Sequence, residues 1–266
     1  MKLLCPICGE ILDRIEKQYR CGNGHSFDLA RQGYVNLLPV QQKRSLNPGD
    51  TREQVLGRRA FLETGCYEPI SNALNETAKA LGATGPILDV GCGEGYYSAR
   101  LAEALGAELT GLDISKEAVR CAAAKYKGPQ WLCGTAAHLP VESHSAGVVT
   151  SLFALTMAEE FKRVLRPDGL FFQVLAAEDH LLGLKSIIYP ELKFKEKNTV
   201  PEVPGFELVK SVPIRFTFTV EGEQVQNLLG MTPHVFRITK EGAERLAATT
   251  QLTDTASAVL NIYRPN

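Results

Sequence analysis

Between residues 86 and 176, short apolar segments alternate with stretches in which apolar residues recur every three or four positions. The short segments predict strands at 87–90, 109–112, 130–132, 147–152 and 170–175. The stretches between them predict helices at 96–105, 115–126 and 157–165, and a turn at 166–169. Strands that alternate with helices in this way form a parallel sheet with helices on both faces. We therefore expect an α/β domain.

The pattern differs on either side of this region. Thr51 and Gln54 form the capping-box pair of a helix that we expect to run to about residue 63, and a second helix at 69–81 ends before Gly82. After residue 180, alternating segments predict strands at 212–220 and 256–263, separated by a helix near 223–229. These two strands predict an antiparallel edge to the sheet. We divide the chain into a small lobe at 1–35, a linker with helices at 36–85 and the α/β domain at 86–266.

Composition narrows the classes of protein. The chain has 266 residues, of which 44% are hydrophobic and 22% charged, which excludes fibrous and largely disordered classes. No apolar run reaches the roughly 18–20 residues that span a bilayer. The N-terminus lacks the pattern of a signal peptide, and seven cysteines do not suggest a secreted disulfide framework, so we expect a cytoplasmic protein. Residues 1–60 carry a net charge of +4 and the remainder −5, which permits contact with nucleic acid but equally describes an ordinary solvated face.

The first lobe contains a metal-binding pattern. Cys5 and Cys8 form one Cys-x2-Cys pair, and Cys21 and His25 follow as a second pair after twelve intervening residues. Three thiolates and an imidazole suit a tetrahedral Zn²⁺ ion, and with four protein ligands the site is structural rather than catalytic. The alternative, a redox pair, leaves Cys21 and His25 unexplained. Cys66, Cys92, Cys121 and Cys133 lie in or beside apolar runs and are predicted to be core residues.

A glycine-rich turn follows the first predicted strand of the domain. Gly91, Gly93 and Gly95 have G-x-G-x-G spacing, which differs from the dinucleotide pattern G-x-G-x-x-G. Asp89 precedes the turn, Glu94 lies within it, and Asp113 ends the next strand, where a carboxylate can accept hydrogen bonds from ribose hydroxyls. Because these acids suit a cationic ligand that has no pyrophosphate, we expect S-adenosylmethionine. The alternative is a glycine turn in an α/β domain that binds nothing.

A third segment belongs to the same predicted site. Residues 134–140 follow the third strand, where an adenine would lie against backbone near Ala136. Methyltransferases often carry an acid here, whereas this chain has Ala136, Ala137 and His138. We interpret His138 as a capping or solvent-exposed residue rather than a catalyst.

These motifs together resemble a known family. The chain is similar to class I S-adenosylmethionine-dependent methyltransferases, and more narrowly to the bacterial 23S rRNA (guanine-N1)-methyltransferases that carry an N-terminal zinc lobe. The resemblance covers nearly the whole chain. Besides the zinc ligands and the glycine turn it involves the following runs: His25 to Ala30, Gly33 to Leu38, Pro48-Gly49-Asp50, Arg58 to Leu62, Tyr67-x-Pro69 and Met231-Thr232-Pro233.

The resemblance implies a Rossmann-like methyltransferase domain, a zinc lobe that helps to hold an RNA hairpin, and a homodimer. It implies that Tyr67, Gly93, Glu94 and His180 contact the cofactor and that Asp113 contacts its ribose. Two segments differ from the family, and both flank the expected target pocket. Ala154-Leu155 replaces the usual Ala-Pro, and residues 175–179 replace a Pro-Gly-Pro-like run.

The first functional hypothesis is therefore methylation of guanine N1 in an rRNA hairpin. The alternatives are methylation of a small molecule, and a paralogue that binds RNA or cofactor without turnover. The basic candidates for phosphate contact are Arg14, Lys17, Arg20, Lys43, Arg44, Arg58 and Arg59, while Tyr19 and Tyr34 either stack on bases or are buried. Glu178, Asp179 and His180 lie near the expected acceptor site, but no general base is assigned.

Overall fold

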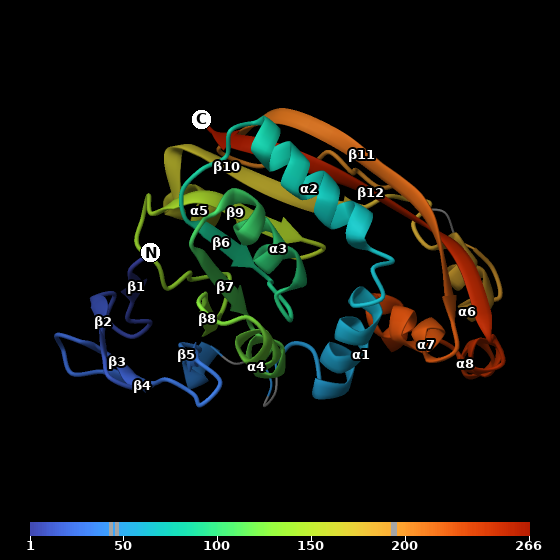
Figure 1. Cartoon of the computed structure of the whole chain (residues 1–266), viewed down its shortest axis with the longest axis horizontal. Coiled ribbons are helices and arrows are strands. Elements are labelled where there is room, and N and C mark those ends of the chain that lie inside the picture. Colours follow the sequence, from blue (N-terminus) through green and yellow to red (C-terminus); the bar gives the residue numbers. More distant parts are fainter. Residues whose placement is uncertain (43–44, 46–47, 193–195) are drawn as a thin grey trace.

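The computed structural model describes residues 1–42, 45, 48–192 and 196–266 of the chain. Within these residues the strands form two sheets, one of four strands and one of eight. The smaller sheet lies at one end of the molecule, and the larger sheet extends through the rest of it (Figure 1). The α/β class predicted from the alternating pattern is confirmed.

The four-stranded sheet is formed by the N-terminal segment. Its strands β1 (Leu3–Leu4), β2 (Ile11–Ile15), β3 (Gln18–Cys21) and β4 (Ser26–Asp28) pair in sequence order, each antiparallel to the next. Leu3, which is buried, forms an isolated bridge with Val141, and the Leu4 N–H donates to the Pro140 carbonyl at 2.9 Å. The lobe is therefore docked on the α/β part of the chain rather than hanging from it.

The eight-stranded sheet has the order β11-β12-β10-β9-β6-β7-β8-β5. The strands from β10 to β5 pair in parallel, whereas β12 pairs antiparallel with both β10 and β11. Their bounds are β5 (Tyr34–Asn36), β6 (Ile87–Val90), β7 (Leu109–Asp113), β8 (Gln130–Cys133), β9 (Ala146–Leu152), β10 (Leu165–Ala176), β11 (Phe206–Glu221) and β12 (Gln251–Pro265). The antiparallel edge predicted from the sequence is thus confirmed.

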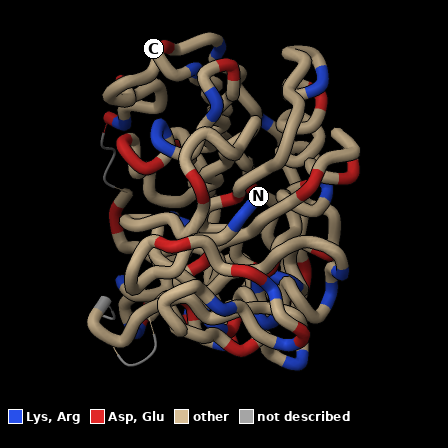
Figure 2. The backbone as a smooth tube through the Cα atoms, turned by 90° about the vertical axis from the view of Figure 1, so that its left-hand side faces the viewer, with Lys and Arg blue, Asp and Glu red and all other residues tan. Residues whose placement is uncertain are grey.

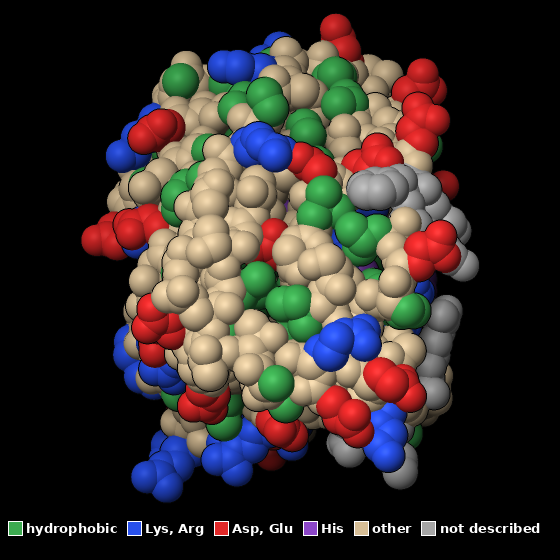
Figure 3. Space-filling view, turned by 90° about the vertical axis from the view of Figure 1, so that its right-hand side faces the viewer, with side chains coloured by type: hydrophobic (Ala, Val, Ile, Leu, Met, Phe, Trp, Pro, Cys, Tyr) green, Lys and Arg blue, Asp and Glu red, His purple; other side chains and the backbone are tan. Residues whose placement is uncertain are grey.

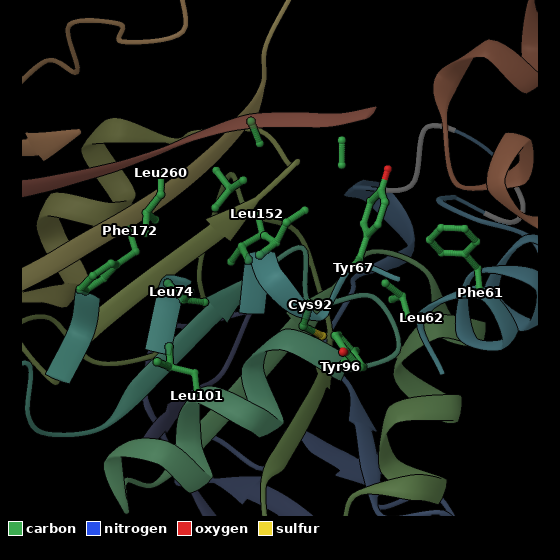
Figure 4. Close-up of a cluster of buried hydrophobic side chains, with 14 of the residues drawn as sticks. Phe61, Leu62, Tyr67, Leu74, Cys92, Tyr96, Leu101, Leu152, Phe172 and Leu260 are labelled. Atoms are coloured by element: carbon green, nitrogen blue, oxygen red, sulfur yellow. The ribbon is translucent and has the colours of Figure 1, made fainter. Parts of the chain in front are cut away.

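Side chains on the two faces of this sheet enter two separate cores. On one face, Ile87 and Phe172 pack with residues of α2 (Glu68–Ala80), α3 (Tyr96–Leu105) and α4 (Lys116–Lys125), and Figure 4 shows part of this cluster. On the other face, Leu88 and Phe171 pack with α5 (Ala158–Val164) and with Leu3, Leu12 and Tyr19 of the N-terminal lobe. Adjacent residues of one strand enter different cores because side chains alternate across a sheet. The N-terminal lobe thereby covers part of one face.

The remaining helices gather at the end of the sheet opposite the N-terminal lobe (Figure 1). They are α1 (Arg52–Leu62), α6 (Leu182–Ile188), α7 (Glu223–Gly230) and α8 (Lys240–Ala247), with a short 3₁₀ turn at Pro233–Phe236. Another short 3₁₀ turn, Val40–Gln42, follows β5. The predicted capping box of α1 is present, since the Thr51 hydroxyl accepts from the Gln54 N–H and the Gln54 side chain accepts from the Thr51 N–H. Among the described residues, no helix is both long and apolar enough to cross a membrane.

Candidate functional site

Two turns of the N-terminal lobe bring Cys5, Cys8, Cys21 and His25 together. The Gly9 N–H donates to the Cys5 carbonyl at 2.8 Å and the Gly24 N–H to the Cys21 carbonyl at 3.0 Å. Both glycines have positive φ, 77° and 84°, so each turn uses a backbone conformation that L-residues rarely adopt. The four ligand atoms all lie within 4.8 Å of one another.

The distances between these atoms fit a tetrahedral zinc site. Zn–S bonds of about 2.3 Å and a Zn–N bond of about 2.0 Å require S–S edges of about 3.8 Å and S–N edges of about 3.5 Å. The Cys8 and Cys21 Sγ atoms are 3.7 Å apart, and His25 Nδ1 lies 3.6 Å from Cys5 Sγ and 3.4 Å from Cys21 Sγ. His25 would therefore bind the metal through Nδ1.

The surroundings of Cys8 also favour its metal-binding thiolate form. A hydrogen bond from the Glu10 N–H, followed by one from the Asn23 side chain, lowers the pKa of Cys8 to about 6. Burial raises the pKa of Cys5. A bound cation would offset that cost, because a coordinating thiol loses its proton to the metal.

A second candidate site is a cavity of about 430 Å³ at the carboxyl end of the parallel strands. Its wall is formed by the turn after β6 and by the ends of β7, β9 and β10, with further residues from the starts of α2 and α6 and from the segment after α7. Figure 3 shows a hollow in this side of the molecule, with acidic and histidine side chains visible inside it and hydrophobic ones around it. In open parallel sheets, ligands bind at this edge.

One wall of the cavity is acidic. Glu94 is almost fully buried, and this burial raises its pKa to about 7, although Arg58 acts in the opposite direction. Burial also raises the pKa of Asp113, although hydrogen bonds from the Ser115 and Gly93 N–H groups oppose the shift. Asp50 lines the same cavity and forms an ion pair with Arg58, with 2.5 Å between Oδ2 and Nη2. A cationic ligand would lower the cost of ionising Glu94 and Asp113.

Hydrogen bonds fix the glycine turn against β7. The Gly91 and Cys92 N–H groups both donate to the Leu112 carbonyl, and the Gly93 N–H donates to Asp113 Oδ2 at 2.9 Å. Gly91 has a φ of 82°, and a Cβ there would lie 2.7 Å from Ala154 Cβ. Gly95 has a φ of 86°, and a Cβ there would lie 2.6 Å from the ring of Trp131. Glycine is therefore required at both positions.

Asp89 has a different place from the other predicted acids. It is buried in β6, where it accepts a hydrogen bond from the Thr150 hydroxyl of β9 at 2.6 Å, and burial raises its pKa to about 6. Asp89, Gly95 and Ala136 do not appear among the described residues that line the cavity, whereas Tyr67, Gly91, Gly93, Glu94, Asp113 and His180 do. Ala136 instead packs at the edge of the core shared with the N-terminal lobe.

Tyr67 and His180 form a hydrogen-bonded pair in the cavity wall. The Ser257 N–H donates to His180 Nδ1 at 3.1 Å, so Nε2 carries the ring proton and points at the Tyr67 hydroxyl, 3.4 Å away. Burial, together with Lys185, lowers the pKa of His180 to about 4, which keeps the imidazole neutral. Burial also raises the pKa of Tyr67. The pair therefore offers neutral hydrogen-bonding groups rather than charges.

Ala154 and Ala176, from the two segments that differ from the family, line the cavity. The basic and aromatic candidates that the structure describes lie outside it, with one exception. Arg58 lines it, while Arg59 is paired with Glu63 on the outer surface. Tyr19 and Tyr34 are buried, which favours packing over base stacking. Lys43 and Arg44 fall outside the described residues. On the side of the molecule that carries the N-terminal lobe, basic and acidic positions are interspersed (Figure 2).

Several cavity residues were not predicted to belong to this site. Some of them occur in runs that carry the family resemblance, so the sequence marked them without assigning a role: Gly49, Asp50, Met231, Thr232 and Pro233. Lys185 ends the run from His180 that also carries the family resemblance, whereas Phe153, Lys197 and His234 had no such signal. They reach the cavity through the fold of segments that follow β9, β10 and α7.

The polar groups that line the cavity fit S-adenosylmethionine. The carboxylates of the cavity wall would face the sulfonium and ammonium groups of this molecule. Asp113 lies where ribose hydroxyls could donate to it. Tyr97 is among the residues that line the same cavity, and its hydroxyl is buried without a hydrogen-bond partner within the described part of the chain. Since a buried hydroxyl normally has a partner, a ligand group is expected to complete it.

The sheet order, the glycine turn, the acid at the end of β7 and the cavity above them define a class I methyltransferase. The methyltransferase domain family matches residues 88–173, and the RlmA N-terminal zinc-ribbon family matches residues 3–46. The fold is similar to that of a protein assigned as a type II methyltransferase from Anaeromyxobacter dehalogenans, with 19% identity and a TM-score of 0.52 over 72% of this chain and 97% of that one.

Curated relatives match over most of the chain. The 23S rRNA (guanine(748)-N(1))-methyltransferase of Streptomyces fradiae is 34% identical, over 87% of this chain and 84% of its own length. A Micromonospora griseorubida protein assigned as a 23S rRNA (guanine-N1)-methyltransferase is 32% identical, over 99% and 97%. The chain belongs to this family and is an S-adenosylmethionine-dependent methyltransferase with a zinc ribbon.

Proposed function

We propose that this chain transfers a methyl group from S-adenosylmethionine to N1 of a guanine in a hairpin of 23S rRNA. The observation that carries the proposal is the similarity to 23S rRNA (guanine-N1)-methyltransferases over 99% of the chain, zinc ribbon included. A small-molecule methyltransferase has no need of a metal lobe fused to one face of its sheet, whereas an RNA hairpin needs a contact surface larger than the cavity.

The proposed donor site uses both polar and neutral groups. Asp113 would accept from the ribose hydroxyls, Glu94 would face the cationic end of the donor, and Tyr67 and His180 would supply neutral hydrogen bonds. Gly91 and Gly93 would allow the backbone to approach it, while Asp89 and Gly95 hold the turn in place from behind. Bound S-adenosylmethionine supplies a methyl carbon already activated by its sulfonium.

The chain's part in the reaction is positioning and exclusion of water. The target guanine must leave its hairpin stack to reach the cavity, as bases of single-stranded RNA usually do in recognition. Its N1 loses a proton during transfer, so a hydrogen-bond acceptor near N1 assists. The zinc ribbon, held by Cys5, Cys8, Cys21 and His25, supports the RNA-binding surface by fixing the N-terminal lobe on the sheet.

We also propose that the protein acts as a homodimer in the cytoplasm, where its rRNA substrate is found, and that the lobe at 1–35, the linker at 36–85 and the domain at 86–266 are its functional divisions. The dimer rests on the family resemblance, and sedimentation equilibrium tests it directly. A mass of twice the chain supports the dimer, and a monomer at micromolar concentration contradicts it.

The experiment that tests the function compares modified nucleosides of 23S rRNA from cells with and without the gene. We expect 1-methylguanosine to fall by one residue per 23S rRNA molecule in its absence and to return with a plasmid copy. An unchanged nucleoside profile would refute the rRNA assignment. Methylation of a small-molecule acceptor by the purified protein would then support the alternative.

A further inference from the structure

Phe153 occupies a strained position directly after β9. Its φ is 55°, in the left-handed region that bulky residues rarely enter. The turn is held by a hydrogen bond from the Phe153 N–H to the Val174 carbonyl at 2.9 Å and by one from the Ser151 hydroxyl to the Leu155 carbonyl at 3.2 Å. Glycine would adopt this backbone conformation without strain. We therefore attribute the presence of phenylalanine at this position to its aromatic side chain.

The ring of Phe153 is not used for core packing. It is 41% exposed and lines the cavity at the carboxyl end of the sheet. Its centroid lies 6.2 Å from that of His180, with an angle of 32° between the two rings. Phe153 thus provides a partly exposed apolar ring in the cavity wall.

The turn that carries Phe153 packs directly against the glycine turn. A Cβ at Gly91 would lie 2.7 Å from Ala154 Cβ, so the two segments touch. In the sheet order β10-β9-β6-β7, Phe153 follows β9 while Asp113 ends β7, on opposite sides of β6. A molecule over Phe153 therefore lies beside a donor bound through Asp113 and does not occupy the same place.

The charges along the cavity follow the same division, apart from Arg58, which lies on the acidic side and is paired with Asp50. Glu94 and Asp113 lie at the ends of β6 and β7, whereas Lys185 and Lys197 reach the cavity from the side of β10. Lys197 Nζ donates to the Ala177 carbonyl and Lys185 Nζ to the Glu178 carbonyl, both at 3.4 Å, and these carbonyls follow β10. The part of the cavity that contains Phe153 therefore combines an aromatic ring with two lysines. This combination suits an aromatic molecule attached to an anionic backbone.

We propose that the ring of Phe153 is the stacking surface on which the target guanine rests beside the methyl donor. The inference depends on the proposed function and identifies the residue that positions its substrate. A base has a π-face whatever its sequence context, and stacking on a protein ring holds the base flat while leaving its N1 edge free. Phe153 is a positioning residue, since the ring takes part in no bond change.

Three variants separate this role from a structural one. Phe153→Tyr keeps the ring, Phe153→Leu keeps apolar bulk without it, and Phe153→Gly removes the side chain while relieving the positive φ. The Gly variant should therefore fold at least as well as the parent chain. Phe236→Leu is the matched control, because Phe236 is an exposed ring, 77% accessible, that is not among the described residues lining the cavity.

Each variant is measured in three ways: kcat/KM for unmodified 23S rRNA, Kd for S-adenosylhomocysteine by calorimetry, and Kd for the rRNA by filter binding at fixed salt. We expect kcat/KM to fall about tenfold to hundredfold in the Leu and Gly variants, from the range for loss of one base–aromatic stack. The Tyr and Phe236→Leu variants should stay within about threefold. In the Leu and Gly variants the Kd for S-adenosylhomocysteine should change little, and the Kd for the rRNA should weaken by no more than the loss in kcat/KM.

Full activity of Phe153→Gly would overturn the inference while leaving the proposed function standing. A weakened Kd for S-adenosylhomocysteine that accounts for the whole loss would also overturn it, because the ring would then stack on the adenine of the donor. Failure of the parent chain itself to methylate rRNA would refute the proposed function and this inference with it.

Discussion

Glu94 makes donor binding depend on pH in a direction that follows from its burial. The carboxyl group lies in the cavity wall, and burial raises its pKa to about 7 in the free protein. A bound cationic donor favours the ionised form and so lowers the pKa. Donor affinity must therefore rise as pH increases through 7, and binding below pH 7 must release a proton.

The size of the effect follows from the pKa. With a pKa of about 7, Glu94 is about 9% ionised at pH 6 and about 91% ionised at pH 8, so the donor Kd should fall about tenfold between them. At pH 6.5, about three-quarters of a proton should be released per donor bound. Asp113 contributes in the same direction, because its pKa is also raised, but less of that effect is expected since two N–H groups already stabilise its charge.

Isothermal titration calorimetry in two buffers of different ionisation enthalpy measures both quantities. Glu94→Gln is the matched variant, since it keeps the shape of the side chain and removes its titration. The amino group of the free donor titrates equally in both titrations, so the difference between the two proteins reports Glu94 together with its effect on the bound donor. Equal pH dependence in the parent chain and in Glu94→Gln would refute the reasoning, as would the absence of proton release at pH 6.5.

Four further predictions follow from the same structure. The raised pKa of Glu94 means that the folded, donor-free protein binds more protons than the unfolded chain between the ordinary pKa of 4.5 and about 7. The free energy of unfolding therefore falls as pH rises across that window, by about 3 kcal/mol at pH 8. Glu94→Gln should abolish this loss, as measured by urea unfolding. Cys21→Ser should reduce bound zinc from about one per chain to less than half by mass spectrometry, and full occupancy would contradict the assigned ligands. Gly91→Ala should lower stability by about 1–3 kcal/mol, because of its positive φ and the short contact with Ala154 Cβ; an unchanged melting temperature would show that the turn is not rigid. Asp113→Asn should weaken donor binding about tenfold or more, in the range of about 1.5–3 kcal/mol for a hydrogen bond to a charged group, and unchanged affinity in calorimetry would place the ribose elsewhere.

Local signals predicted much of the fold. The strand at 87–90 and the helix at 96–105 agree with β6 and α3 in their bounds, because an apolar run bounded by glycines determines both. Thr51 and Gln54 predicted the start of α1 through hydrogen bonds within one turn. The four zinc ligands were recognisable from spacing alone, since two short turns bring them together.

Features that depend on distant pairing were not predictable in this way. β5 has three residues and pairs in parallel with β8, almost a hundred residues later, so no local period marks it. The strands β11 and β12 extend well beyond the predicted segments because their pairing continues through exposed positions at the sheet edge. The helices α6 and α8 were also missed, although α5 and α7, which are equally short, were predicted.

The same distinction applies to the site. The glycine turn and Asp113 follow adjacent strands, and their meeting at one edge is a property of any parallel sheet. Phe153 could not be recognised, because a phenylalanine after an apolar strand reads as core until its φ and exposure are known. Lys185 and Lys197 reach the cavity only through the path of the chain after β10.

The central claim is methyl transfer to guanine N1 of 23S rRNA, and a reconstituted reaction tests it most directly. The purified, zinc-loaded protein is incubated with S-adenosylmethionine carrying an isotope-labelled methyl group and with 23S rRNA from cells that lack the gene, and the digested nucleosides are separated by mass spectrometry. We predict one labelled 1-methylguanosine per rRNA molecule, and labelling at least about tenfold slower with Asp113→Asn at limiting donor. Label in another nucleoside, or none in a protein shown by calorimetry to bind the donor, would contradict the account.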